Sequence, residues 1–192
     1  MIFMPPKAKV TKEAIINAAL DLVRESGADV LNARAVAARL GTSTQPIFSH
    51  YESMDALKQD IIRSANSMYQ IYLHQDMTSG KHPPYKASGM GYIRFAREEQ
   101  ELFKLLFMRD RSGEMIPTES DEIAPLIELI HKTTGISNEK ARQFHLQMWI
   151  YVHGIATMAA TNYLPWDMDY VSSSISEVYN ALMDQYTREV SE

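Results

Sequence analysis

Side chains suited to hydrogen bonding with bases lie close together between residues 42 and 50 of the 192-residue chain. The amide of Gln45 can both donate to and accept from one adenine, whereas Thr42, Thr44 and Pro46 can pack on thymine methyl groups. The sequence has no nucleophile elbow, phosphate-binding glycine loop, dinucleotide fingerprint or HExxH motif. This stretch therefore favours recognition of nucleic acid over catalysis, and a helical enzyme would need an acid–base pair that the sequence does not reveal.

Two short helices with a sharp turn between them are expected to position these side chains. Asn32 is a good N-cap, because its side-chain oxygen can accept a free backbone N–H of the first turn. Residues 33–40 are rich in strong helix formers, and Gly41 is expected to end the helix in the left-handed conformation. We expect Ser43 to cap a second helix that begins at Thr44. The pattern predicts a helix-turn-helix whose second helix enters the major groove of DNA.

Pro46 is compatible with this second helix. A proline in the first turn removes only an N–H that no carbonyl of the helix would have accepted. Gln45 precedes the proline and is biased away from helical angles, so we expect a stiff, slightly irregular first turn. Apolar contact between the two helices is expected from Val36, Leu40 and Ile47.

The same stretch resembles the DNA-binding signature of the TetR family of transcriptional repressors. Val36 and Ala37 match the signature's Ile-Ala-like pair, Gly41 matches its turn glycine, and residues 47–51 match its aromatic-x-His-aromatic ending. The resemblance implies an all-α, TetR-like fold of about nine helices, in which a three-helix helix-turn-helix head joins a helical body. It also implies a repressor that binds a palindromic operator as a homodimer and is released by a small-molecule effector.

Two residues depart from the family's pattern. Phe48 stands where the family usually has a tyrosine, and Met54 stands where it usually has a lysine. Both usual residues contact phosphates, so the departures reduce the expected anchoring to the DNA backbone without affecting the fold. They keep a second hypothesis open, that of an all-helical dimeric binding or interaction protein whose head has lost or weakened its DNA binding and docks protein instead.

The predicted DNA contacts come from the second helix and from the start of the first. Arg34 is expected either to contact a phosphate or to be ordinary solvated surface. His50 is expected to meet a phosphate, and by family position the resemblance places the second helix against DNA. The complete predicted DNA-binding set is Asn32, Arg34, Thr42, Thr44, Gln45, Pro46, Phe48, Ser49 and His50.

Charge is distributed unevenly along the chain. The formal net charge is −5 at pH 7, yet residues 1–51 carry six Lys/Arg and four Asp/Glu, which leaves +2 there and −7 in the remainder. Such an asymmetry suggests a double-stranded DNA partner at the N-terminal end only. Without the helix-turn-helix pattern, a few solvated lysines would carry no information.

Several classes of protein and site are excluded. The chain has no cysteine, which rules out disulfides and cysteine-ligated zinc. No apolar run approaches the roughly 18 residues of a membrane span, and residues 1–6 are too short and interrupted for a signal peptide. His145 and His153 lie about 80° apart around a helix and make a poor metal pair. We therefore expect a cytoplasmic protein without membrane association, metal or cofactor.

Hydrophobic periodicity predicts helices throughout. We expect a first helix capped by Thr11 and ending near Ser26, and a long helix, capped by Ser53 and running to about residue 73, that links the head to the body. The remaining predicted helices span residues 85–96, 101–108, 121–134, 137–163, which Ser137 opens, and 167–189. We expect a DNA-binding domain over residues 1–52 and a regulatory, ligand-binding and dimerisation domain over 53–192. The resemblance implies that the last two helices pair across a two-fold axis.

The predicted body combines many methionine and aromatic side chains with few polar groups, as a site for a small organic ligand does. A methionine or an aromatic residue on a helical stripe is more often plain core. Trp149, His153 and Gly154 resemble a Trp-His-Gly element of the regulatory domains in part of the TetR family. The candidate ligand-binding residues are Phe95, Phe103, Phe107, His145, Met148, Trp149, His153 and Asn162.

Overall fold

The computed structural model describes residues 10–112, 123–163 and 166–188, and within them the chain is all-α, as predicted. The described residues form nine α-helices and one short 3-10 helix. In chain order these are α1 (Lys12–Ser26), η1 (Ala28–Val30), α2 (Ala33–Arg39), α3 (Gln45–His50), α4 (Met54–Thr78), α5 (Pro84–Glu98), α6 (Gln100–Phe107), α7 (Ala124–Thr134), α8 (Asn138–Ala160) and α9 (Met168–Arg188). None of these described helices combines the length and the hydropathy of a membrane span.

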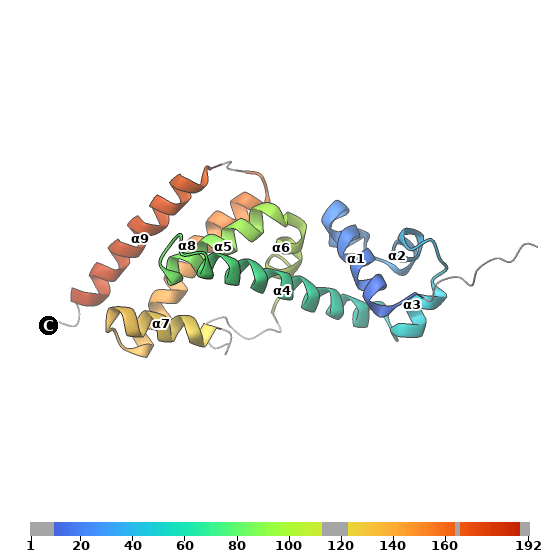
Figure 1. The fold of residues 1–192 in the computed structure, drawn as a ribbon, viewed down its shortest axis with the longest axis horizontal. Helices are drawn as coiled ribbons and strands as arrows, with labels where there is room; N and C mark the ends of the chain where they lie inside the picture. The colour runs from blue at the N-terminus through green and yellow to red at the C-terminus, as the bar shows by residue number, and fades with distance from the viewer. Residues whose placement is uncertain (1–9, 113–122, 164–165, 189–192) are drawn as a thin grey trace, which may run out of the picture.

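Helices α1, α2 and α3 form a head at one end of the molecule, and α4 runs from this head into the body (Figure 1). The head core is fully buried, and its members are aliphatic side chains from all four helices: Ile15, Val23, Val36, Ile47 and Leu57. Burying each such side chain contributes roughly 1.5–3 kcal/mol relative to leaving it exposed. These contacts fix the position of α3, whose six residues are too few to be stable as an isolated helix.

The helix starts follow the predicted capping residues. The side chains of Thr11, Asn32, Ser53 and Ser137 each accept a backbone N–H of the first turn of α1, α2, α4 and α8, respectively. Each cap satisfies donors that have no carbonyl partner inside the helix. The predicted boundaries at these four residues are therefore confirmed.

The turn between α2 and α3 agrees with the prediction at Gly41 but not at Ser43. Gly41 adopts a φ of +63°, the left-handed conformation that glycine enters without a Cβ clash. The prediction that Ser43 caps a helix beginning at Thr44 is wrong, because α3 begins at Gln45 and has no side-chain cap. Thr44 occupies the cap position with helical angles (φ −74°, ψ −14°), whereas a capping side chain needs an extended backbone. Pro46 still lies in the first turn.

Two long helices have different lengths from those predicted. Helix α4 continues to Thr78, one turn past the predicted end, because its last turns pack along α5, its most extensive neighbour among the described elements. Helix α8 ends at Ala160, short of the predicted Tyr163, since Asn162 adopts a φ of +54°. The predicted start of the 121–134 helix falls partly outside the described residues, and α7 begins at Ala124.

Helices α5, α6 and α8 enclose the centre of the body, with α7 and α9 on its outer side (Figure 1). The fully buried rings of Phe95, Phe103 and Phe144 come from α5, α6 and α8. A single apolar cluster joins these rings to the head core through Ile61 and Ala65 of α4. The head and the body therefore share one continuous core, and α4 contributes side chains to it in the head and in the body.

Candidate functional site

The outward face of the head is formed by α3. Gln45, Phe48, Ser49 and His50 are exposed, whereas Ile47 is fully buried against the rest of the head. The Phe48 side chain is 50% exposed, which is unusual for a phenylalanine. Helices α2 and α3 lie at the opposite end of the molecule from α7 and α9 (Figure 1). This geometry leaves α3 free to approach a large partner without contact from the body.

The turn before α3 presents three further predicted contacts. Thr42, Thr44 and Pro46 are half-buried, so each retains part of its surface beside the exposed Gln45. The hydroxyl of Ser49 donates to the carbonyl of Pro46 at 2.7 Å. The Ser49 hydroxyl therefore donates its hydrogen bond within the helix, and only its oxygen is available, as an acceptor, to an outside partner.

Asn32 has both ends of its side-chain amide engaged. Its Oδ1 accepts the backbone N–H groups of Arg34 and Ala35, each at 3.0 Å, and its Nδ2 donates to the carbonyl of Val30 at 3.0 Å. A contact between this amide and DNA would compete with the cap of α2. The backbone N–H groups at the start of α2 lie beside the exposed side chain of Arg34.

The two arginines of α2 have different surroundings. Arg39 forms a two-pronged ion pair with Glu25 of α1, at 2.6 and 2.5 Å, and this contact holds the pKa of the Glu25 carboxyl below its usual range. Arg34 is exposed, and no carboxylate among the described residues pairs with its guanidinium. Arg34 is therefore the α2 cation with its hydrogen-bonding capacity open to a phosphate.

His50 ties the segment before α1 to the end of α3. Its Nε2 lies 2.9 Å from the carbonyl oxygen of Val10. Because a carbonyl only accepts, Nε2 carries the proton and donates it. This bond keeps Val10 on the α3 side of the head.

Besides the pair between Glu25 and Arg39, two described ion pairs connect α1 to α4 and to the body. Lys12 pairs at 2.7 Å with Asp60 of α4, a carboxylate that is only 8% exposed and also pairs with Arg63. Arg24 binds Glu99 through two parallel bonds of 2.8 and 3.0 Å. Glu99 lies between α5 and α6, so this second pair joins the head directly to the body without passing through α4.

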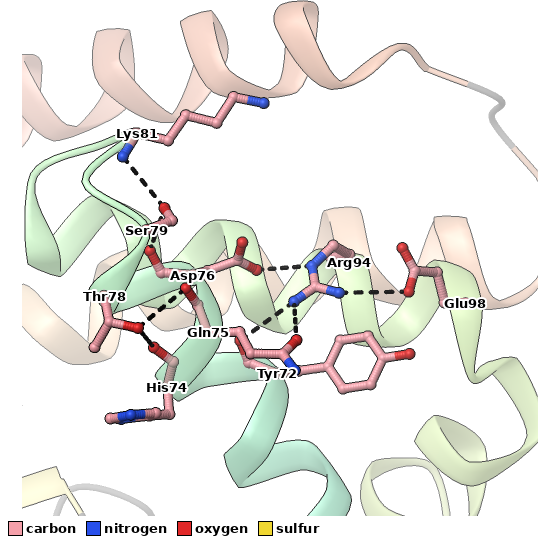
Figure 2. Close-up of polar contacts among 9 residues, drawn as sticks. All are labelled: Tyr72, His74, Gln75, Asp76, Thr78, Ser79, Lys81, Arg94 and Glu98. Atoms are coloured by element: carbon pink, nitrogen blue, oxygen red, sulfur yellow. Dashed lines mark hydrogen bonds and ion pairs between the residues drawn. The ribbon is translucent and has the colours of Figure 1, made fainter.

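Arg94 of α5 holds the body end of α4 in place (Figure 2). Its guanidinium bonds the carboxylate of Asp76 at 2.9 Å and the amide oxygen of Gln75 at 3.1 Å. It also lies 4.3 Å from the centre of the Tyr72 ring, a cation–π contact. Burial, reinforced by Glu98, raises the pKa of Tyr72 to about 12, so the phenol stays neutral. A single arginine thus links two successive turns of α4 to α5.

A cavity of about 420 Å³ opens in the body. This volume lies within the range of small-molecule sites, about 300–1,000 Å³. Side chains from α4, α5, α7, α8 and α9 surround the cavity, and most are apolar: Tyr69, Leu73, Pro83, Pro84, Ile123, Leu126, Leu129, Met148, Trp149, Val152, Ile175 and Tyr179. The cavity therefore suits an organic molecule with an apolar body.

Three of the eight predicted ligand residues line this cavity, namely His145, Met148 and Trp149. The other five lie elsewhere. Phe95 and Phe103 are fully buried in the core, and Phe107 packs on it. His153 is hydrogen-bonded to Tyr92, and Asn162 exchanges hydrogen bonds with Gln100 beyond the end of α8. They are away from the cavity because a periodic pattern identifies a buried face without distinguishing core from cavity wall.

The polar groups of the cavity wall are Tyr85, Lys86, Ser88, Thr133, His145, Ser176 and Asn180. The hydroxyl of Tyr85 lies 3.0 Å from Nδ1 of His145. Burial lowers the pKa of His145 to about 4 and raises that of the Tyr85 phenol, so both are uncharged at neutral pH. Nζ of Lys86 donates to Oγ of Ser176 at 2.8 Å.

Sequence reasoning did not identify Lys86, Ser176 or Asn180. Lys86 sits two residues after a Pro-Pro pair, which marks a helix start, and a lysine in the first turn of a helix is out of place beside the positive end of the dipole. That signal was present in the sequence. Ser176 and Asn180 lie on the predicted last helix with no local feature that separates them from solvated surface, so only packing places them at the cavity. Among the described residues, no group of three or more His, Asp or Glu side chains could hold a metal.

Two family models match most of the chain. Residues 15–61 match the model described as bacterial regulatory proteins, tetR family, and residues 85–185 match the model described as tetracyclin repressor-like, C-terminal domain. The first covers α1 to the start of α4, and the second covers the body from α5 onward. Together they include the outward face of α3 and most of the cavity wall.

Known proteins with the same organisation include one curated relative and several solved structures. An uncharacterized HTH-type transcriptional regulator of Mycobacterium tuberculosis is 22% identical over 158 residues, which are 80% of this chain and 72% of that protein. A TetR-like transcriptional regulator from Rhodococcus sp. RHA1 superposes with a TM-score of 0.63 at 15% identity, over 94% of this chain and 96% of that one. A TetR variant from Acinetobacter baumannii, in complex with minocycline, gives 0.55 at 16% identity, over 94% and 98%. These structural likenesses establish the fold.

Proposed function

This chain belongs to the TetR family of DNA-binding transcriptional regulators, and we propose that it is a repressor that a small organic effector releases from its operator. One arrangement carries the proposal: the exposed α3 lies at one end of α4 and the cavity at the other. Because α4 belongs to both ends of the core, a ligand that shifts its body end also moves the head. Coupling between two such sites is typically about 1–3 kcal/mol. We propose no catalytic role.

We propose that α3 enters the major groove with Gln45 facing base edges and Arg34 beside a phosphate. The exposure of Gln45 and the open guanidinium of Arg34 support these roles. The remaining proposed contacts are the turn and helix residues Thr42, Thr44, Pro46, Phe48, Ser49 and His50, with Asn32 contributing through the helix start that it caps. Residues 1–52 would form the DNA-binding head and residues 53–192 the regulatory body.

We propose a homodimer that forms through α8 and α9. Large apolar side chains are exposed along this side of the body: Ile150 of α8 is 58% exposed, Tyr170 of α9 is 54% exposed, and Tyr163 between them is 73% exposed. A stable dimer of this kind buries on the order of 2,000 Å² or more. Two heads related by a two-fold axis suit a palindromic operator with half-sites about 34–36 Å apart.

The volume of the cavity and its apolar wall support a small organic effector, and the Acinetobacter baumannii relative was solved with minocycline. A DNA partner also implies that the protein acts in the cytoplasm. The half-exposed Phe48 favours one other candidate function, a head that docks a protein instead of DNA.

Selection of bound sequences from random duplex DNA tests the proposal, with the mass of the complex measured on the same sample. We expect an enriched inverted repeat and a dimer. Gln45→Ala should change the preferred bases while the salt dependence of binding stays the same, because a base contact neutralises no phosphate. Gln70→Ala is the matched control, an exposed glutamine in the middle of α4.

Two outcomes would count against the proposal. If no sequence is enriched with or without extracted cell metabolites, the head does not act on DNA, and protein docking through Phe48 becomes the better account. If Gln45→Ala selects the same sequences as the unmodified protein, Gln45 does not contact a base.

A further inference from the structure

We infer that the cavity takes an apolar monocarboxylate, an aliphatic or aromatic acid whose carboxylate pairs with Lys86. This inference rests on the proposed effector role of the cavity and specifies the chemical class of its ligand. It follows from the charge of the cavity wall, the hydrogen bonds that Lys86 leaves unused, and the position of the start of α5.

The first argument is the charge of the wall. Of the twenty residues that the described structure places around the cavity, Lys86 is the one with a side chain charged at neutral pH, and none is Asp or Glu. His145 does not add a charge, because burial lowers its pKa to about 4. The nearby Tyr85 phenol is neutral as well, since burial raises its pKa. Among the described wall residues, an anion in this cavity would therefore meet a single cation and no competing carboxylate.

The second argument is the hydrogen bonding of Lys86. An ammonium has three donors, and the bond that the structure gives it leads to the hydroxyl of Ser176 at 2.8 Å. Ser176 passes its own proton to the carbonyl of Ser172 at 3.2 Å, so its oxygen acts purely as an acceptor toward Lys86. No described carboxylate neutralises this half-buried ammonium. A ligand carboxylate would satisfy the open donors and balance the charge.

The third argument is the position of the α5 N-terminus. Pro83, Pro84, Tyr85 and Lys86 all line the cavity, so the first turn of this 15-residue helix borders it. The N–H groups of Tyr85 and Lys86 precede the first intrahelical bond, in which Ala87 donates to Pro83 at 2.9 Å. Unsatisfied amides and the positive end of the dipole favour an anion at the same place as the ammonium.

The remainder of the wall determines the other end of the ligand. Leucine, isoleucine, valine, methionine and tryptophan side chains from α4, α7, α8 and α9 make up most of the remaining wall, among the uncharged polar groups of Thr133, His145 and Asn180. Such a wall offers no second cation for the several charges of a phosphate ester. The ligand is therefore an acid with one charged end and an apolar body, rather than a sugar phosphate or a nucleotide.

Displacement of a fluorescent neutral probe tests the inference on the full-length protein. N-Phenyl-1-naphthylamine serves as the probe, and decanoate and decanol, equal in chain length, serve as charged and neutral competitors below micelle-forming concentrations. We measure the ratio of their Kd values in the unmodified protein, Lys86→Met, Lys86→Arg and the control Lys132→Met, whose lysine pairs with Glu128 on the exposed side of α7.

We expect Lys86→Met to reduce the preference for decanoate over decanol by about ten- to a hundredfold, as for loss of a charged hydrogen bond. Lys86→Arg should keep most of the preference, and Lys132→Met all of it. Binding of decanol to Lys86→Met shows that this variant is folded. An unchanged ratio in Lys86→Met would overturn the inference.

The same experiment separates this inference from the effector role. If decanoate binds with the expected dependence on Lys86 but leaves the affinity for the selected DNA unchanged, the ligand class stands and the effector role fails. If decanol displaces the probe as well as decanoate does in every protein, the cavity is a ligand site but the monocarboxylate inference fails. If neither competitor nor probe binds, both fail.

Discussion

The DNA-contact surface draws all its proposed residues from positions 32–50, whereas the cavity wall draws its residues from five helices that span positions 69–180. In the head, the same short segment supplies the caps, the turn and the exposed polar side chains. Residues that are close together in the sequence are therefore also close together in the structure. In the body, each helix contributes two to five wall residues, and the empty volume depends on how all five pack. A site built from one segment is therefore visible in the sequence, while a site built from packing is not.

The two regions also differ in what their charged groups do. In the head, the ion pair between Arg39 and Glu25 lies at the surface and leaves Arg34 open to solvent and to DNA. In the body, Lys86 and His145 line a largely apolar cavity, and burial lowers the pKa of His145 so that it is uncharged at neutral pH. We propose that the head presents Arg34 to a large external polyanion, whereas Lys86, the one cation among the described cavity-wall residues, serves a small ligand.

The substitution with the largest expected effect tests whether the head unfolds separately from the body. Ile47→Ala in α3 removes a fully buried side chain and should lower the free energy of unfolding by about 2–5 kcal/mol. Both tryptophans, Trp149 and Trp166, lie in the body, so their fluorescence reports on the body while circular dichroism reports on all helices. Because one core joins the two regions, we expect both signals to shift together in urea at fixed protein concentration.

Ile71→Ala is the control for this experiment, since Ile71 of α4 is 54% exposed and its truncation should change little. If circular dichroism falls in Ile47→Ala before the tryptophan signal moves, the head unfolds by itself. The contrast between head and body would then extend to their stability as well as to the way their sites are built.

The next largest effect is a pH dependence that belongs to the body. The pKa of His145 is about 4 in the folded protein, against an ordinary value of 6.5, because of burial. Between pH 6.5 and 4 the unfolded chain binds a proton that the folded chain excludes, so stability falls as the pH falls. The full decrease in the free energy of unfolding is about 3 kcal/mol and is reached below pH 4.

Urea unfolding of His145→Gln at pH 7 and pH 4 measures this loss. We expect the variant to lose about 3 kcal/mol less than the unmodified protein over that interval, whatever its stability at pH 7. His74→Gln, which changes an exposed histidine of α4, should leave the pH dependence unaltered. Equal pH dependence in His145→Gln and the unmodified protein would mean that His145 titrates normally in the fold.

The smallest expected effect concerns the direct link between the two regions. Arg24→Met removes the two-pronged ion pair with Glu99 and should cost about 1 kcal/mol, because the guanidinium is partly exposed and screened. Adding Glu99→Gln should cost little more, since the pair is already broken. Arg97→Met, at an exposed arginine in the last turn of α5, serves as the control. Additive costs for Arg24→Met and Glu99→Gln would indicate that the pair does not couple head to body.

The comparison also explains which predictions succeeded. The caps at Thr11, Asn32, Ser53 and Ser137 followed from residue type, because a capping bond spans only three residues. The prediction at Ser43 failed, since Thr44 adopts helical angles and takes the cap position of α3 without a side-chain hydrogen bond. The extra turn of α4 depends on α5, which contacts it from another part of the chain.

Among the ligand candidates, Met148 and Phe103 had the same sequence signal, an apolar residue on a helical stripe. The structure places Met148 at the cavity and Phe103 in the solid core. Lys86 had a weak signal, a cation at the start of a helix, which gained meaning only when α9 brought Ser176 within 2.8 Å.

The sequence by itself determined the all-α fold, the helix-turn-helix, most helix boundaries and the exposed face of α3, because each depends on residues within a few positions of one another. The tertiary structure alone decided which apolar side chains fill the core and which surround a cavity, and which charged group is left among them. Those outcomes depend on the relative placement of five helices, and the free energy of a buried charge depends on every element around it. The local periodicity of a sequence gives neither the placement of the helices nor the free energy of a buried charge.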